Sequence, residues 1–190
     1  MLADLSLRAL LDELAGPREV PGAGSSLAAA LAMAAATVQM AARLSTESWP
    51  EASGIAAQAE ALRDRARALV DEDAESYSRA LEALRVRGQA EDIQERRDWE
   101  LGRATGSALE PPLALVRAAA DLAELCREAA IHVAPHVQAD VGAAAALAAG
   151  VARGARELVA VNLTALPDDP RVAEADRLVA LAESAAEPGP

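Results

Sequence analysis

The sequence predicts an all-α protein, an antiparallel bundle of six to seven helices in one domain over residues 1–190. Three observations predict this fold. Of the 190 residues 51 are alanine, only 2% are aromatic and none is phenylalanine. A core of alanine, leucine and valine favours closely approached helices over stacked sheets. Apolar residues recur at helical spacing, and no segment alternates as a half-buried strand does.

The first two helices lie on either side of a glycine loop. Four leucines at helical spacing predict an amphipathic helix over residues 2–14, ended by Gly16-Pro17. Pro21–Gly24 predicts a tight loop, and Ser25 or Ser26 is expected to cap the next helix. That helix runs to about residue 45 and is apolar on every face, which places it at the centre of the bundle.

Five further helices complete the bundle. Prolines and glycines separate them, among them Pro50, Gly88 and Pro135. A break is expected over residues 108–112, with Pro112 in the first turn of the helix after it. Gly142, Gly150 and Gly154 in an Ala-rich helix indicate either close approach to a neighbour or second subunit, or compositional drift. The expected ranges are 53–84, 89–103, 112–131, 138–163 and 171–185.

Charge and cysteine content exclude several classes of protein. All 18 basic residues are arginine against 30 acidic ones, a net charge of -12, so binding of nucleic acid through bulk charge is not expected. The single Cys126 excludes an internal disulfide and a cysteine-based zinc site. No secretion signal precedes the first helix. The apolar runs 27–42 and 141–152 are short and bounded by charge, so a soluble, cytoplasmic protein without membrane contact is expected.

Two features are candidates for a catalytic site. Pro21–Ser26 lies directly before a helix, where glycines allow backbone N–H groups to approach an anion. The alternative is an ordinary turn with a serine cap. Asp71 and Asp73 interrupt an apolar run and cannot share a helix face, so at most one points into the core. A buried carboxylate would have the raised pKa that suits general acid–base catalysis, whereas a solvated one would not.

Two other features have strong structural explanations. Asp140 opens the most apolar helix, where a carboxylate commonly caps the helix or interacts with its dipole. His132 and His136 have the i, i+4 spacing of a zinc pair, but Pro135 lies between them and no third ligand is apparent. No metal site is therefore expected.

Taken in order, the motifs resemble the cyclodeaminase/cyclohydrolase family of folate enzymes. The resemblance covers residues 5–181 and rests on the order and spacing of short motifs, none of which is specific alone. The matching segments are Pro21-Gly22-Ala23-Gly24-Ser25, Leu44-Ser45, Asp73-Ala74-Glu75-Ser76-Tyr77, Pro112-Leu113, Asp140-Val141-Gly142, Arg153-Gly154-Ala155 and Asn162-Leu163.

The resemblance implies a homodimer that hydrolyses methenyltetrahydrofolate to formyltetrahydrofolate, without a metal or organic cofactor. Cyclisation of formimidoyltetrahydrofolate with release of ammonia is the alternative reaction. The chain has no room for a transferase domain, which favours the hydrolase. Ala23 replaces a family glycine, and Ala134–Ala139 lacks the family's asparagines and serine. A non-catalytic folate-binding or assembly protein therefore remains a third interpretation.

The resemblance also assigns roles to individual residues. Asp73 would be the general acid–base, and Asp140 a second carboxylate that holds the pterin or tunes Asp73. The loop formed by Gly22, Gly24 and Ser25 would hold a polar or anionic part of the substrate. Arg153 would bind the glutamate carboxylates of the folate, although a surface arginine is the simpler interpretation.

Overall fold

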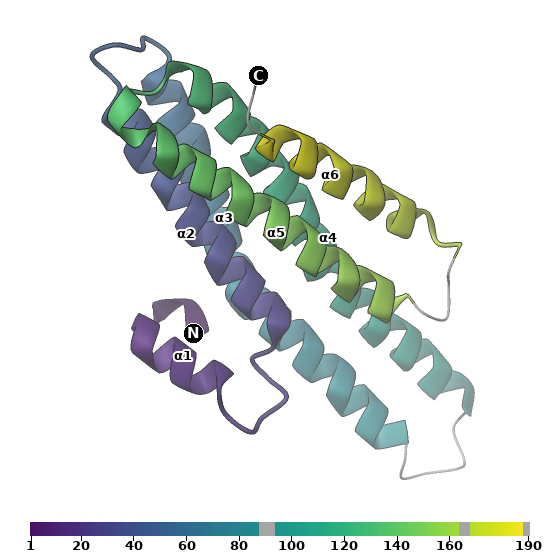
Figure 1. Cartoon of the computed structure of the whole chain (residues 1–190). Coiled ribbons are helices and arrows are strands. Elements are labelled where there is room, and N and C mark those ends of the chain that lie inside the picture. Colours follow the sequence, from purple (N-terminus) through teal and green to yellow (C-terminus); the bar gives the residue numbers. More distant parts are fainter. Residues whose placement is uncertain (88–93, 164–167, 188–190) are drawn as a thin grey trace.

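Four long helices form the bundle in a computed structural model that describes residues 1–87, 94–163 and 168–187, without the side chains of 83–107. They are α2 (Ala23–Arg43), α3 (Ala52–Arg87), α4 (Gln94–His132) and α5 (Gln138–Asn162). Each packs against the next in the chain, and α5 closes the ring against α2 (Figure 1). The described residues contain no strand, so the predicted all-α bundle is confirmed.

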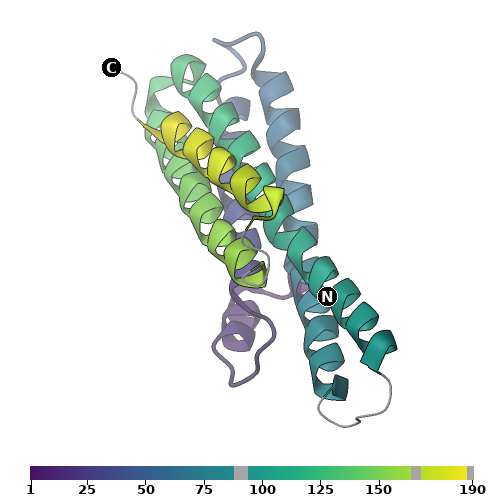
Figure 2. The same cartoon turned by 90° about the vertical axis from the view of Figure 1, so that its right-hand side faces the viewer.

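The remaining helices lie outside this ring. Helix α6 (Pro170–Ala186) packs along both α4 and α5. Helix α1 (Leu7–Leu14) lies at the N-terminal end of α2, apart from the bundle (Figure 1). A view from the side shows that α3 and α4 extend as a hairpin beyond the ends of α2 and α5 (Figure 2). The ends expected at Gly88, at Pro167 and in the last three residues lie outside the described part of the chain.

The prediction of one N-terminal helix over residues 2–14 is wrong. A 3-10 turn, η1 (Leu2–Asp4), precedes α1, and Ser6 caps α1 by accepting a hydrogen bond from the Ala9 N–H at 3.2 Å. Serine competes well for a helix N-terminus, which explains the interruption. The carboxylate of Asp71 on α3 accepts the N–H of Leu2 at 2.5 Å and so fixes the turn to the bundle.

The break expected over residues 108–112 is also wrong, because α4 continues through Pro111 and Pro112. A proline in a helix removes the N–H that would bond the carbonyl four residues earlier. For Pro112 that carbonyl belongs to Ala108, and the side-chain amide of Asn162 on α5 donates to it at 3.3 Å. A neighbouring helix thus supplies the missing donor. A second 3-10 turn, η2 (Pro135–Val137), connects α4 to α5.

Alanine allows the helices to approach closely. Ala34, Ala35 and Ala41 of α2 are completely buried, which matches the expectation that this helix is central. A Cβ on Gly154 would lie 2.9 Å from the Leu27 side chain, so the close approach predicted for this glycine is confirmed between α5 and α2. Helix α2 is long and apolar enough to cross a bilayer, yet half of it is buried inside the bundle, as in the core helix of a soluble protein.

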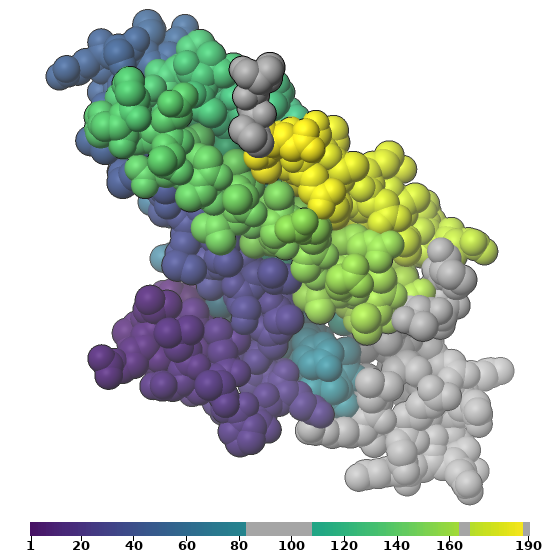
Figure 3. Space-filling model, viewed as in Figure 1, coloured from purple at the N-terminus to yellow at the C-terminus, as the bar shows by residue number. Residues whose placement is uncertain are grey.

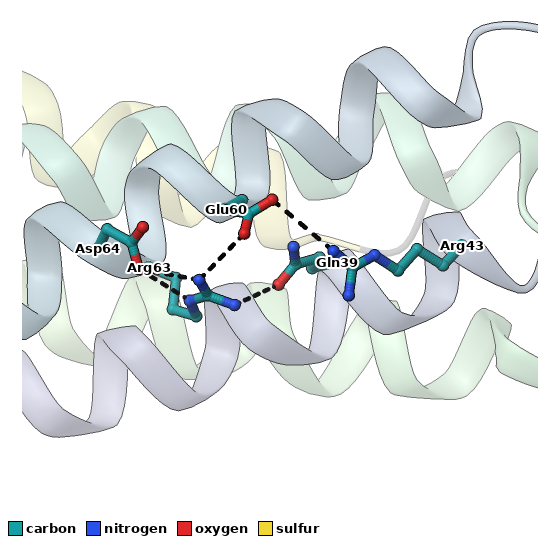
Figure 4. Close-up of polar contacts among 5 residues, drawn as sticks. All are labelled: Gln39, Arg43, Glu60, Arg63 and Asp64. Carbon is teal, nitrogen blue, oxygen red and sulfur yellow. Dashed lines mark hydrogen bonds and ion pairs between the residues drawn. The ribbon is translucent and has the colours of Figure 1, made fainter.

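Polar contacts hold α2 to α3 on their outer side (Figure 4). The buried amide oxygen of Gln39 accepts a hydrogen bond from Arg63 at 2.7 Å. Glu60 lies between two arginines, 3.3 Å from Arg63 and 3.7 Å from Arg43. The Arg63 guanidinium also pairs with Asp64, whose Oδ1 lies 2.9 Å from the Arg63 Nη2. These exposed pairs fix the relative positions of the two helices more than they stabilise the fold.

Candidate active site

Asp73 is buried at the contact between α2 and α3. Its side chain and backbone together are only 8% exposed. The hydroxyl of Ser25 lies 3.3 Å from the Asp73 Oδ2 and 2.9 Å from the Val70 carbonyl oxygen, so these two acceptors share its one proton. The other acidic residue of the pair, Asp71, faces away toward the N-terminus. The prediction that at most one of the two carboxylates enters the core is therefore confirmed.

Gly24 leaves the space that the Asp73 carboxylate occupies. A Cβ added to Gly24 would lie 2.0 Å from Oδ1 and 2.6 Å from Oδ2, closer than any real contact. Glycine is required at position 24 because the Asp73 carboxylate approaches so closely. Backbone conformation is not the reason, since no described glycine has a positive φ. Ala23 is exposed where it lines the pocket, which explains why a methyl group is tolerated there.

The loop expected over Pro21–Gly24 is shorter than predicted, because Pro21 and Gly22 precede the helix but Ala23 and Gly24 belong to it. Helix α2 begins at Ala23, with Gly22 as its N-cap residue and no side-chain cap. Ser25 lies inside the first turn and Ser26 donates back to the Gly22 carbonyl, so neither serine caps the helix as expected. The backbone N–H groups of this first turn still lie next to Asp73.

Two opposing effects determine the pKa of Asp73. Burial raises the pKa above its ordinary value, because a carboxylate loses its hydration inside the bundle. Hydrogen bonds from the side chain and backbone of Ser25 lower it in part. The raised pKa is the property expected of a general acid–base.

A pocket of about 290 Å³ opens beside Asp73. Four helices contribute to its wall: Gly22 to Gly24 precede or open α2, Tyr77 lies on α3, Pro112 on α4, and Asn162 ends α5. Asn162 and Tyr77 lie in motifs noted in the sequence, but no role was predicted for either. Glu19, which also lines the pocket, carried no sequence signal.

Comparison with known proteins identifies the family of this chain. A family model described as formiminotransferase-cyclodeaminase matches residues 6–180. The chain belongs to the formiminotransferase-cyclodeaminase family. The crystal structure of formiminotetrahydrofolate cyclodeaminase from Thermotoga maritima has the same fold, with a TM-score of 0.82 at 22% identity over 98% of this chain and 92% of that one. Among curated proteins, none matches in sequence.

Within this family member, Asp140 does not lie near Asp73. It occupies the first turn of α5, whereas Leu158 near the other end of that helix lines the pocket. Eighteen residues of helix separate the two, roughly 27 Å at 1.5 Å per residue. One chain therefore does not bring the two predicted carboxylates together.

Arg153 is also placed outside the pocket. It lies on α5 and its guanidinium pairs with Glu183 of α6 at 3.3 Å, with 64% of the side chain exposed. Its surroundings are a second, charged cavity between α5 and α6 that contains Arg156 and Asp176. The structure thus favours the simpler interpretation, a surface arginine.

The histidine pair has no third ligand nearby. Over residues 1–87, 94–163 and 168–187, no group of three His, Cys, Asp or Glu side chains is placed to hold a metal ion. The ring of His132 stacks on Trp49, with the centroids 5.2 Å apart. Cys126 is buried, and burial raises the pKa of its thiol to about 12. This residue is therefore an inert part of the core.

Proposed function

We propose that this protein catalyses a reaction of one-carbon folate metabolism, the hydrolysis of methenyltetrahydrofolate to formyltetrahydrofolate. Family membership supports the substrate class. The observation that carries the proposal is the buried Asp73 carboxylate, which is held by Ser25 and faces a pocket assembled from four helices.

Asp73 supplies the proton transfer that this reaction needs. A water molecule adds to the cationic carbon between the two folate nitrogens, and the Asp73 carboxylate accepts one of its protons. The same proton then moves to the nitrogen whose bond to carbon breaks, while the hydroxyl loses its proton to solvent as the formyl group forms. A raised pKa brings the carboxyl closer to the pH at which the enzyme works, which favours both uptake and release of a proton. We propose that neither a metal nor an organic cofactor takes part.

The pocket wall provides groups that orient the folate. The first turn of α2, from Gly22 to Gly24, presents backbone N–H groups to a polar part of the substrate. Tyr77 of α3 and Asn162 of α5 also line the pocket. The roles predicted from the family for Asp140 and Arg153 stay predictions.

A second reaction uses the same chemistry, namely the cyclisation of formimidoyltetrahydrofolate to methenyltetrahydrofolate with loss of ammonia. It also passes through a tetrahedral carbon between two nitrogens. A solved structure with the same fold is that of a formiminotetrahydrofolate cyclodeaminase, which favours including this reaction in the test.

An absorbance assay distinguishes the two reactions, because the methenyl form has its own absorbance band. Purified protein is mixed separately with each folate, and the spontaneous reaction is subtracted. We expect faster loss of the band from methenyltetrahydrofolate, and a decrease in kcat of about 10²- to 10⁴-fold in Asp73→Asn. Glu72→Gln, an exposed neighbour on α3, is the matched control and should retain full activity.

Other outcomes contradict specific parts of the proposal. Appearance of the band from formimidoyltetrahydrofolate, without hydrolysis, would assign the protein as a cyclodeaminase. No turnover of either substrate, together with saturable folate binding, would leave a non-catalytic binding protein. Full activity in Asp73→Asn would exclude Asp73 as the acid–base.

We also propose that the protein is a cytoplasmic homodimer. Helix α2, the candidate membrane span found among the described residues, is half buried in the bundle, which supports a soluble protein.

A further inference from the structure

The side-chain amide of Asn162 is held in one orientation by a neighbouring helix. Its Nδ2 atom donates to the Ala108 carbonyl oxygen of α4 at 3.3 Å. Pro112 has no N–H, so this carbonyl lacks its ordinary helical donor and the amide takes that place. Turning the amide over would set its oxygen against the carbonyl oxygen, and two acceptors form no hydrogen bond. The Asn162 Oδ1 atom is therefore fixed on the other side of the amide.

This fixed oxygen is available to a ligand. No described group of the protein donates a hydrogen bond to the Asn162 Oδ1. The residue is half-buried and lines the same pocket as Asp73. Ligand pockets orient their ligands through a few placed polar groups, and an acceptor with a fixed direction is such a group.

A second amide on the same helix provides a comparison. Gln138, at the start of α5, donates through its Nε2 to the Ala130 carbonyl oxygen of α4 at 3.0 Å. The Gln138 side chain is exposed and lies at the opposite end of α5 from Asn162. Both amides are thus anchored to α4 in the same way, but only Asn162 lines the Asp73 pocket.

Two helix ends of opposite polarity meet at this pocket. The start of α2, from Gly22 to Gly24, carries unpaired backbone N–H donors, whereas the last turns of α5 form the negative end of a helix dipole. The two ends lie close together on the face of the molecule seen in Figure 3. A ligand edge that carries both a carbonyl oxygen and an amino group would match this pair of helix ends.

The size of the pocket indicates which part of a folate it would take. Its volume of about 290 Å³ lies at the lower limit for small-molecule sites, so it suits the pterin and not the whole folate. The pyrimidine edge of the pterin carries a carbonyl oxygen and a 2-amino group, and it is the edge farthest from the reacting carbon. Asp73 on α3 and Asn162 on α5 belong to helices diagonal to each other in the four-helix ring, so they would contact different parts of the pterin.

We propose that Asn162 is a positioning residue, whose Oδ1 accepts a hydrogen bond from the 2-amino group of the pterin and so places the reacting carbon against Asp73. The inference rests on the folate substrate of the proposed function. It does not depend on which of the two reactions occurs, because both substrates have the same pyrimidine edge. Pro112 acts indirectly, since it creates the free carbonyl that orients the amide.

The test compares two ligands that differ only in the 2-amino group. One is 5-formyltetrahydrofolate, which keeps the pterin but lacks the methenyl bridge, and the other is its analogue with a methyl group in place of the amino group. Calorimetric titration of the purified full chain gives both dissociation constants. In the parent, we expect the analogue to bind about 10-fold more weakly, as for the loss of one hydrogen bond. In Asn162→Ala, the two ligands should bind within about 2-fold of each other.

The ratio of the two constants separates ligand contact from folding. Both ligands are measured on the same protein, so a partly unfolded variant changes both constants together and leaves their ratio unchanged. Gln138→Ala is the matched control, because it removes the same kind of anchoring bond outside the pocket, and it should keep the ratio of the parent.

A Pro112→Ala background removes the structural role of Asn162. The restored backbone N–H can serve the Ala108 carbonyl, so the fold no longer needs the Asn162 amide. If Asn162 contacts the pterin, then Asn162→Ala should still abolish the preference for the 2-amino group in this background.

Two results would overturn this role of Asn162 without contradicting the proposed function. One is equal binding of the two ligands by the parent. The other is the same preference in the parent and in Asn162→Ala, which would place the amino group on a different acceptor. Absence of saturable binding of either ligand by the parent would instead contradict the folate substrate itself, and the role of Asn162 with it.

Discussion

At the scale of single residues, the carboxyl of Asp73, the proposed acid–base, makes the stability of the fold depend on pH. Its carboxyl has a raised pKa in the fold because burial disfavours the charge. Between the ordinary pKa and the raised one, the folded state binds more protons than the unfolded state, so stability falls as the pH rises. Above the folded pKa the buried charge destabilises the fold by a constant amount.

We therefore predict that Asp73→Asn unfolds at a higher temperature than the parent at pH 8. The amide has the same shape, still accepts from Ser25 and carries no charge to desolvate. The difference should shrink as the pH falls through the raised pKa, and it should vanish well below the ordinary pKa of 3.8, where the carboxyl is neutral in both states. Thermal melts of both proteins at pH 4, 6 and 8 measure it. A difference that grows toward acidic pH would mean that Asp73 is stabilised as a carboxylate.

Gly24 provides a second prediction at this scale. Gly24→Ala places a methyl group on the Asp73 carboxylate, which must move because the Cβ would lie 2.3 Å from its carboxyl carbon. We expect a loss of about 1–3 kcal/mol in the free energy of unfolding, as for other overpacked sites, together with a large fall in kcat.

Gly54→Ala is the control for the Gly24 substitution. Gly54 also lies in the first turn of a long helix, but a Cβ there meets nothing within 4 Å. Its stability should be unchanged or higher by up to about 1 kcal/mol, since alanine is the better helix former. Chemical denaturation of the two variants and the parent checks both values, and equal effects would refute the role given to Gly24.

The sequence allowed some of these residues to be found, but not all. Asp73 sits in an apolar run, and an acidic residue at an inward position of a helix is visible in the periodicity. The contact of Asp73 with Gly24 joins two helices, and periodicity along one helix contains no information on which helices meet. Asn162 and Glu19 reach the pocket in the same way, through tertiary packing alone.

At the scale of helices, prolines were the features that sequence reasoning misinterpreted. Pro111 and Pro112 predicted a break because a proline removes a backbone hydrogen bond and crowds the preceding turn. That expectation assumes an isolated helix. Here Asn162 of α5 donates to the Ala108 carbonyl, so the helix continues and two expected helices become one.

A double-mutant cycle tests this account of α4. Asn162→Ala leaves the Ala108 carbonyl without its side-chain donor, which should cost about 1–3 kcal/mol in the free energy of unfolding. In a Pro112→Ala background the backbone N–H is restored, so the same Asn162 substitution should cost less by about 1 kcal/mol or more. Denaturant melts of the four proteins give the coupling. Equal costs in both backgrounds would show that Asn162 does not compensate for the proline.

At the scale of the whole molecule, charge and composition determine behaviour more than any motif does. The fold class followed from alanine content and helical spacing, which are properties of the entire chain. The sequence did not predict the separation of Asp140 from Asp73. That separation depends on which ends of the helices are neighbours in the folded bundle, and the order of the helices along the chain does not specify this.

The net charge of -12 gives the last prediction, that added salt stabilises this protein. Twelve uncompensated negative charges repel one another in the compact state, and this repulsion is screened over about 10 Å at 0.1 M salt. Salt also weakens the surface ion pairs, but exposed pairs contribute little, so the relief of repulsion should dominate. Relief worth about 1 kcal/mol corresponds to a rise in Tm of about 2–4 °C for a chain of this size. Thermal melts at 10 mM and 200 mM NaCl, repeated with KCl to exclude a specific cation, measure the shift. A fall in Tm with either salt would mean that the arginine–carboxylate pairs between helices outweigh the repulsion.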